Sequence, residues 1–291
     1  MPFVAPTVVR RVVQNVTTET PDLLAVEEPL EIRLGYGPAQ DRQQRSLVVT
    51  MRTPGVDAEL ATGFLYAENI IQQPADVLSC RHCVQDAEKE GNVIRVELRP
   101  GLAVDWQRLE RITVSSASCG LCGKTTIEAA MAHTNGPLMA DFSVDSAIVH
   151  NLPDRVRQLQ TAFAHTGGIH AAALFDADGT IRLVREDIGR HNALDKLIGA
   201  AFWKGWLPLS DCGIFLSGRI GVELVQKSWR AGVPLLAAVG APSSLAVQMA
   251  REARMTLVGF VRDDRFNIYT EPDRLITQAS APATPPAAHG H

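Results

Sequence analysis

The sequence predicts an α/β protein, with some α+β character, in which a strand-rich N-terminal part precedes a larger part where strands and helices alternate. Up to about residue 110, short runs such as 92–98 alternate between apolar and polar residues and are bounded by glycine and proline. From about residue 160, strand and helix patterns follow each other, as in βαβ units on a mixed or parallel sheet. Residues 279–291 are rich in Ala and Pro, without periodicity. We therefore expect a strand-rich domain over 1–110, an α/β domain over 111–278 and a disordered tail over 279–291.

The N-terminal part is predicted to contain three strands, over 30–37, 46–52 and 92–98. Residues 57–71 are predicted to form an amphipathic helix, because their apolar positions keep helical spacing, and Asp57 is the candidate N-cap. A capping-box pattern, Thr125 to Glu128, predicts a further helix directly after a cysteine-containing stretch.

The C-terminal part is predicted to begin with a hairpin within 169–187, because Asp178–Gly179 is a typical turn between two strand patterns. A helix is then expected over 190–205. Two strand–loop–helix units follow, with strands opening the segments 212–219 and 233–244 and helices over 220–232 and 244–254. Strands over 255–262 and 266–270 complete the predicted sheet.

Composition narrows the class of protein. The 291 residues are 46% hydrophobic and carry a net charge of −4, so a large core is possible and bulk affinity for nucleic acid is not expected. No apolar run approaches the roughly 20 residues that cross a bilayer, and the first residues lack the pattern of a secretory signal. We expect a cytoplasmic protein that binds neither membranes nor nucleic acid. Its five cysteines, an odd number, argue against a disulfide framework.

The stretch "SSASCGLCGK", residues 115–124, is the strongest candidate for chemistry. Cys119 and Cys122 lie between a predicted strand and a predicted helix. Thiols at a helix N-terminus face free N–H groups and the positive end of the helix dipole, which favours the reactive thiolate, and Lys124 acts in the same direction. The stretch therefore suits a nucleophilic or metal-binding cysteine.

Other interpretations of the cysteines stay open. A thioredoxin-like dithiol oxidoreductase would have an aromatic residue before the pair and a proline inside it, and both are missing. Zinc could be held by Cys80 and Cys83 together with Cys119 and Cys122, although the 35 residues between the pairs exceed the usual interval of about 15–20. Cys212, in an apolar strand, is best explained as a packed thiol.

Three loops that follow predicted strands have residues suited to an anionic ligand. Open α/β sheets bind ligands at the carboxyl ends of their strands, where helix N-termini, hydroxyls and guanidinium groups accommodate phosphate. No Walker or G-x-G-x-x-G signature is present. The predicted binding residues in these loops are Ser217, Gly218, Arg219, Ser243, Ser244, Phe260, Val261, Arg262, Asp263, Asp264 and Arg265.

The segment "REDIGRHNALDK", residues 185–196, places many polar groups beside an apolar stripe. We expect His191 and Asn192 to face the site and Asp187 to orient a partner. Asp187 could equally cap the helix. His170, which opens an apolar strand, is as well explained by a near-core histidine as by a ligand contact.

Four blocks, "SCGLCGK", "TGGIHAAALF", "REDIGRHNALDKLIG" and "LSGRIGVELVQK", occur in this order and closely resemble the formate dehydrogenase accessory sulfurtransferase family, FdhD. The likeness extends from residue 31 to residue 275. It implies a three-layer fold similar to cytidine deaminase and a homodimer. Deaminase activity is not expected, because Ala172 stands where the H-x-E motif beginning at His170 would need its glutamate.

The resemblance also implies a function. Cys119 would take sulfur from a cysteine desulfurase as a persulfide, and Cys122 would assist. The sulfur would pass to molybdenum bis(molybdopterin guanine dinucleotide), bound as cargo, which matures the formate dehydrogenase apoenzyme. Residue chemistry alone does not decide which cysteine holds the sulfur. The alternative is a non-catalytic chaperone for this cofactor with a structural four-cysteine zinc site.

Overall fold

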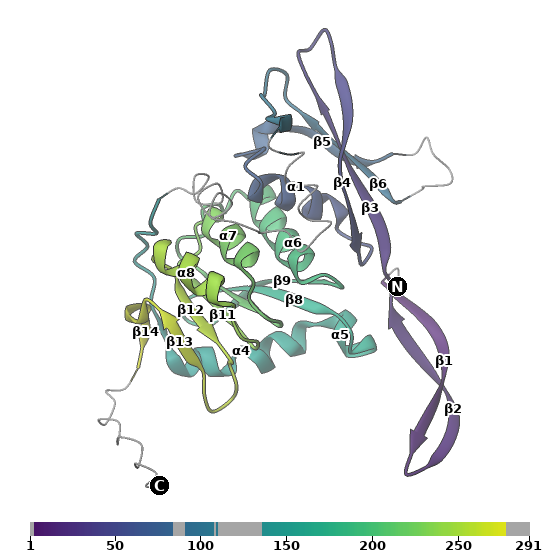
Figure 1. The fold of residues 1–291 in the computed structure, drawn as a ribbon, viewed down its shortest axis with the longest axis vertical. Helices are drawn as coiled ribbons and strands as arrows, with labels where there is room; N and C mark the ends of the chain where they lie inside the picture. The colour runs from purple at the N-terminus through teal and green to yellow at the C-terminus, as the bar shows by residue number, and fades with distance from the viewer. Residues whose placement is uncertain (1–2, 84–90, 108, 110–135, 278–291) are drawn as a thin grey trace, which may run out of the picture.

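The computed structural model describes residues 3–83, 91–107, 109 and 136–277, and its main feature is a mixed sheet of six strands (Figure 1). In spatial order these are β13 (Asn267–Thr270), β12 (Thr256–Gly259), β11 (Leu235–Ala238), β10 (Gly213–Leu216), β8 (His170–Phe175) and β9 (Ile181–Asp187). β10, β11 and β12 are parallel, whereas β8 and β13 run antiparallel to their neighbours. The predicted mixed α/β architecture is confirmed.

Helices cover both faces of this sheet. α6 (Arg190–Trp203), α7 (Val222–Arg230) and α8 (Ser244–Glu252) lie on one face, and α4 (Ser146–Leu159) and α5 (Thr161–Thr166) lie on the other (Figure 1). Alternate strand residues point to opposite faces, so Ile214 joins the core under α6–α8 while Phe215 joins the core above α4. Both residues are almost completely buried, which explains why these strands are apolar on both faces.

A second sheet lies beyond α6, and a single helix separates the two. It contains β4 (Gln43–Arg52), β3 (Glu28–Tyr36), β6 (Val93–Leu98) and β5 (Val77–His82), in that order, and α1 (Asp57–Ala67) lies between it and α6 (Figure 1). One apolar cluster runs from this sheet through α1 into the core of the six-stranded sheet. The core therefore extends across the boundary expected at residue 110.

Helix α1 begins and ends differently from the prediction. Its N-cap is Val56, with φ of 50°, and no side chain caps it. The carboxylate of Asp57 instead forms a buried ion pair with Arg52, at 3.0 Å between Nη2 and Oδ2. The helix ends at Ala67 rather than near residue 71, because Asn69 adopts the left-handed conformation, with φ of 56°, that terminates helices.

Helices α1 and α6 cross at two glycines. A Cβ placed on Gly63 would lie 1.8 Å from the carbonyl oxygen of Asp195, and one on Gly199 would lie 1.8 Å from that of Glu59. Real Cβ atoms never come this close, so the two backbones can approach only because both positions are glycine. This crossing joins the two sheets through their helices.

A hairpin at the N-terminus extends away from both sheets. β1 (Val4–Val13) and β2 (Val16–Ala25) are joined by Gln14 and Asn15, both with positive φ (Figure 1). β7 (Val144–Asp145) and β14 (Leu275–Ile276) form a small parallel pair near the C-terminus. No helix in the described residues is long and apolar enough to cross a membrane.

Candidate functional site

The described residues of the predicted site lie along one edge of the six-stranded sheet. The parallel strands β10, β11 and β12 end there, and the loops after them carry three predicted groups, 217–219, 243–244 and 260–265. β8 runs antiparallel and begins at the same edge with His170, which pairs with Asp187 at the end of β9. Residues from five segments of the chain are thus brought together at the edge where open α/β sheets bind ligands.

The three loops are bonded to one another and form one continuous surface. The backbone N–H of Gly240 donates to Gly218 O at 3.1 Å, and that of Phe260 donates to Gly240 O at 3.2 Å. Position 240 must be glycine, because a Cβ there would lie 2.7 Å from the Cα of Arg219. We call this edge, with its loops and the first turn of α6, the carboxyl-edge crevice.

The hydroxyls in these loops are partly used by the protein itself. Ser217 Oγ accepts a hydrogen bond from the N–H of Ala171 at 2.8 Å. Ser243 is the N-cap of α8 and accepts from the N–H of Ala246 at 3.2 Å. Ser244 and Arg219 are both exposed and so are accessible to a ligand.

The loop after β12 borders a small pocket of about 270 Å³, lined by Phe260, Arg262, Arg265 and Asn267. Arg262 Nη1 donates to the carbonyl oxygens of Val239 and Val261, at 2.9 and 2.8 Å, so this side chain holds the loop as well as bordering the pocket. The side chain of Val261 is fully buried and anchors the loop in the core. Asp263, Asp264 and Arg265 are exposed, in a turn closed by a hydrogen bond from Arg262 N to Arg265 O.

Asp187 and Asn192, in contrast, are bonded mainly within the protein. Asp187 is completely buried, lies 2.6 Å from Lys196 Nζ and accepts from the backbone N–H of Thr53. Asn192 Nδ2 donates to Asp187 Oδ1 at 3.1 Å and to Met51 O at 2.7 Å. The amide of Asn192 is thus committed to β4, and a ligand contact for either residue stays a prediction.

The two histidines lie at the crevice. His191 Nε2 is 2.7 Å from Glu223 Oε2, and this histidine lowers the pKa of the Glu223 carboxyl. His170 is half-buried over Gly218, where a Cβ would lie 3.2 Å from the ring. Burial lowers the pKa of His170, and the positive charge of Arg190 lowers it further. Neither Arg190 nor Glu223 was predicted as a site residue, although Arg190 directly precedes His191.

The cysteines are only partly described. Cys119, Cys122 and the predicted strand and helix around them lie outside the described residues. Cys212 is fully buried, as expected, and burial raises the pKa of its thiol to about 12. Burial and the carboxylate of Asp57 likewise raise the pKa of Cys80 to about 12. Within the part of the chain that the structure describes, no three His, Cys, Asp or Glu side chains are placed to hold a metal ion.

Comparison with known proteins adds a consistent result. A sequence model of the FdhD/NarQ family matches residues 25–276. The sulfur carrier protein FdhD of Mycolicibacterium paratuberculosis is 48% identical, over 88% of this chain and 92% of its own length. The protein of the same name from Streptomyces coelicolor is 44% identical, over 93% of this chain and 95% of its own.

The fold also matches a solved structure. The crystal structure of a proposed formate dehydrogenase accessory protein from Desulfotalea psychrophila superimposes with a TM-score of 0.70 at 22% identity, covering 94% of this chain and 100% of that one. At this identity the likeness concerns the fold alone.

Proposed function

Because this chain belongs to the FdhD/NarQ family, we propose that it is a sulfur carrier that acts in the maturation of formate dehydrogenase. The observation that carries the proposal is the identity of 48% and 44% with two proteins named sulfur carrier protein FdhD, over nearly the whole of each chain. The arrangement of the carboxyl-edge crevice supports it, because a carrier that hands its sulfur to a bound cofactor needs a site for that cofactor.

The sulfur is carried on the pair Cys119 and Cys122. The thiolate of Cys119 attacks the outer sulfur of a persulfide on a cysteine desulfurase. A new S–S bond forms on Cys119 while the donor's S–S bond breaks, and the donor cysteine leaves as thiolate. When the cargo is bound, Cys122 attacks the inner sulfur, so that a Cys119–Cys122 disulfide forms and the outer sulfur passes to the cargo as sulfide; a thiol reductant then returns the disulfide to two thiols. The alternative assignment, in which Cys122 holds the persulfide and Cys119 assists, is the one that the experiment must exclude.

The cargo that receives the sulfur is molybdenum bis(molybdopterin guanine dinucleotide), bound in the carboxyl-edge crevice. Its phosphates suit the guanidinium groups of Arg219 and Arg265 and the N-terminus of α8 at Ser244. The further partners are a cysteine desulfurase and the formate dehydrogenase apoenzyme. We propose a cytoplasmic homodimer, on the strength of the family resemblance.

Mass spectrometry tests the sulfur chemistry directly. After incubation with an active cysteine desulfurase and cysteine, the peptide containing Cys119 and Cys122 should gain the mass of one sulfur atom, about 32 Da. The Cys119→Ser variant should lose the adduct and the Cys122→Ser variant should retain it. If the donor is shown to be active and the wild-type peptide has no adduct, the persulfide carrier is refuted. The alternative, a cofactor chaperone that carries no sulfur, would then be favoured. Zinc content, measured on the same sample, tests the four-cysteine site of that alternative.

Charge reversal tests the crevice. Arg265→Glu should weaken binding of the guanine dinucleotide cofactor by about 10- to 100-fold, because a charge-assisted hydrogen bond to phosphate contributes about 1.5–3 kcal/mol. Arg265 is preferable to Arg262, which also holds the carbonyl groups of Val239 and Val261.

The matched control is Arg251→Glu, an exposed arginine in the last turn of α8, at the far end of that helix from the crevice. It should bind the cofactor as the wild type does. Persulfide formation should be unchanged in both variants. Equal affinities in all three proteins would show that the cargo binds elsewhere.

A further inference from the structure

The N-terminal hairpin, which we call the arm (residues 3–26), is unusually apolar for a segment so exposed. It extends away from the rest of the molecule, and every residue from Arg10 to Glu19 is exposed (Figure 1). Five large apolar side chains on it are 53–67% exposed: Val8, Val12, Val13, Val16 and Leu24. A two-stranded hairpin is at best marginally stable alone in water, so the arm needs a surface to cover it.

Both faces of the arm carry these side chains. Val8 pairs with Pro21 and Val12 pairs with Thr17. Because Val8 and Val12 are four residues apart in one strand, their side chains lie on the same face. Val13 and Val16 form a pair on the opposite face. The arm therefore has the properties of a segment that fits against or between surfaces of a partner.

The faces, rather than the edges, are suited to this contact. β1 contains Pro6 and β2 contains Pro21, each within a ten-residue strand. A proline within a strand has no N–H to offer a further strand, so each outer edge of the arm lacks one donor. Extension of the hairpin by edge-to-edge pairing is disfavoured, and side-chain packing on its faces is the remaining mode.

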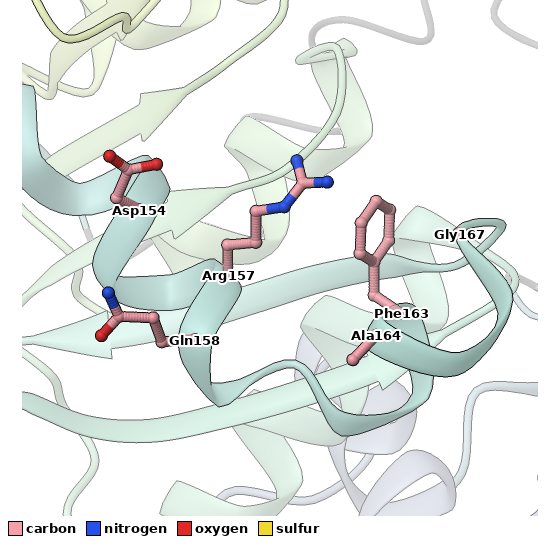
Figure 2. Close-up of a pocket in the computed structure, with 6 residues that line it drawn as sticks. All are labelled: Asp154, Arg157, Gln158, Phe163, Ala164 and Gly167. Atoms are coloured by element: carbon pink, nitrogen blue, oxygen red, sulfur yellow. The ribbon is translucent and has the colours of Figure 1, made fainter.

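A groove of suitable character lies beside the root of the arm. α5 packs against β2 and β1 at that root. Between α4 and α5 is a hollow of about 520 Å³, in which the guanidinium of Arg157 lies 4.8 Å from the centre of the Phe163 ring (Figure 2). Leu159, at the end of α4, is 51% exposed. We call this the α4–α5 groove, and its lining residues are Asp154, Arg157, Gln158, Phe163, Ala164 and Gly167.

We propose that the arm of one copy packs on the α4–α5 groove of a second copy, and that the second copy's arm packs on the first in the same way. The inference rests on the homodimer in the proposed function and identifies the surfaces that form it. Arm and groove are neighbours on one chain, so a single twofold axis between them satisfies both contacts at once, as an isologous interface requires.

The size and charge of the two surfaces agree with a second copy. The two strands supply 20 residues, and a stable interface uses about 20–30 residues on each side. On the exposed part of the arm Arg10 and Glu19 pair with each other, so Arg11 is the charge offered to the groove, where Asp154 carries the opposite sign. Because Gly167 precedes His170 by three residues, the arm of the second copy lies alongside the carboxyl-edge crevice.

The experiment measures molar mass by light scattering and sedimentation across a concentration series. The double variant Val8→Asp/Val12→Asp should raise the dimer dissociation constant at least about 100-fold, because it buries two unpaired carboxylates in the interface. The control Val49→Asp changes a valine of matched exposure, 61% against 63% for Val12, on β4 of the second sheet. It should stay dimeric. A second variant, Ala164→Arg, places charge in the groove from an exposed position and should also be monomeric.

Mixing the two variants gives the sharpest result. Arm variant and groove variant should each be monomeric alone, and their mixture should recover dimers, because one heterodimer contact then joins an unaltered arm to an unaltered groove. A dimeric arm variant, or variants that fail to recover dimers on mixing, would overturn the arm-and-groove interface while leaving the homodimer or the sulfur chemistry intact. A wild type that is monomeric throughout would overturn both the interface and the homodimer. Persulfide formation, measured separately, tests the sulfur carrier alone.

Discussion

His170 combines a titratable ring with a close packing contact at the crevice. Its ring lies over Gly218, and Arg190, Asp187 and His191 all influence its charge. Burial and the nearby arginine lower its pKa, so the ring is neutral at pH 7. A neutral ring packs against the glycine without repelling Arg190, where the start of β8 meets the loop after β10.

The stability of the protein should fall as this ring takes up a proton. The pKa of His170 in the folded state is lower than its unfolded value of about 6.5, so the unfolded chain binds the proton first as the pH falls. The contribution of His170 to stability is therefore full above about pH 6.5 and is lost as the pH drops below it. Urea unfolding at pH 7.5 and 5.5 should show a larger loss for the wild type than for His170→Gln. Equal losses would contradict this assignment.

Single residues also show how much of the site the sequence could predict. The grouping of 217–219, 243–244 and 260–265 at one edge followed from their place after apolar strands, because parallel strands end at the same edge. The burial of Asp187 and Asn192 did not follow, because their partners, Thr53 and Met51, are 134 and 141 residues away in the chain. Only the tertiary fold brings such groups together, and a polar segment looks the same whether its partners are protein or ligand.

The crossing of α1 and α6 is the most demanding contact between elements. Each helix places a glycine against a carbonyl oxygen of the other, Gly63 against Asp195 and Gly199 against Glu59. In an exposed helix, glycine costs about 1 kcal/mol relative to alanine. Here that cost is outweighed by the apolar surface that the close approach buries between the two sheets.

Gly199→Ala should therefore lower the free energy of unfolding by more than about 4 kcal/mol. In an exposed helix the same change normally raises it by about 1 kcal/mol. The reason for the loss is the 1.8 Å separation of the new Cβ from Glu59 O, which forces the helices apart. Gly168→Ala is the control, because its Cβ would meet only an ordinary contact at 3.8 Å. Urea unfolding of both variants gives the comparison. A Gly199→Ala protein as stable as the control would show that the helices are further apart than described.

The elements themselves divide into those with a strong local pattern and those without. The hairpin from His170 to Asp187 was predictable because Asp178–Gly179 is a strong turn signal. The arm was not predicted, because its turn, Gln14–Asn15, lacks the glycine that usually marks a two-residue loop. α4 was also missed, and its Pro153 is one reason, since an interior proline argues against a helix.

On the scale of the molecule, one hydrophobic core joins the two sheets. The cluster that includes Leu30 of β3 and Leu60 of α1 also includes Leu194 of α6 and Leu236 of β11. The strand-rich pattern of the sequence ends near residue 110, which is why a domain boundary was predicted there, but buried contacts cross that position. The division into two domains stays a prediction about how the chain unfolds.

Unfolding should occur in a single cooperative transition. The apolar cluster includes residues of both sheets and of the helices α1 and α6 between them, so loss of one sheet would expose the core of the other. Far-UV circular dichroism and tryptophan fluorescence should give coincident urea curves, with Trp106 reporting on the N-terminal part and Trp229 on the C-terminal part. Single-tryptophan variants separate the two signals. Two separate midpoints would support independent domains on either side of residue 110.

The glycine crossing also affects the crevice. The first turn of α6 lies at the crevice with His191, and Gly199, about two turns later, is fixed against α1 by backbone contact. The wall that α6 provides is consequently preorganised, and binding a cargo there should cost little ordering free energy. Shape adjustment then falls to the loops after β10, β11 and β12. Discrimination between cargoes of different size should depend on those loops, while the α6 wall supplies a constant reference surface.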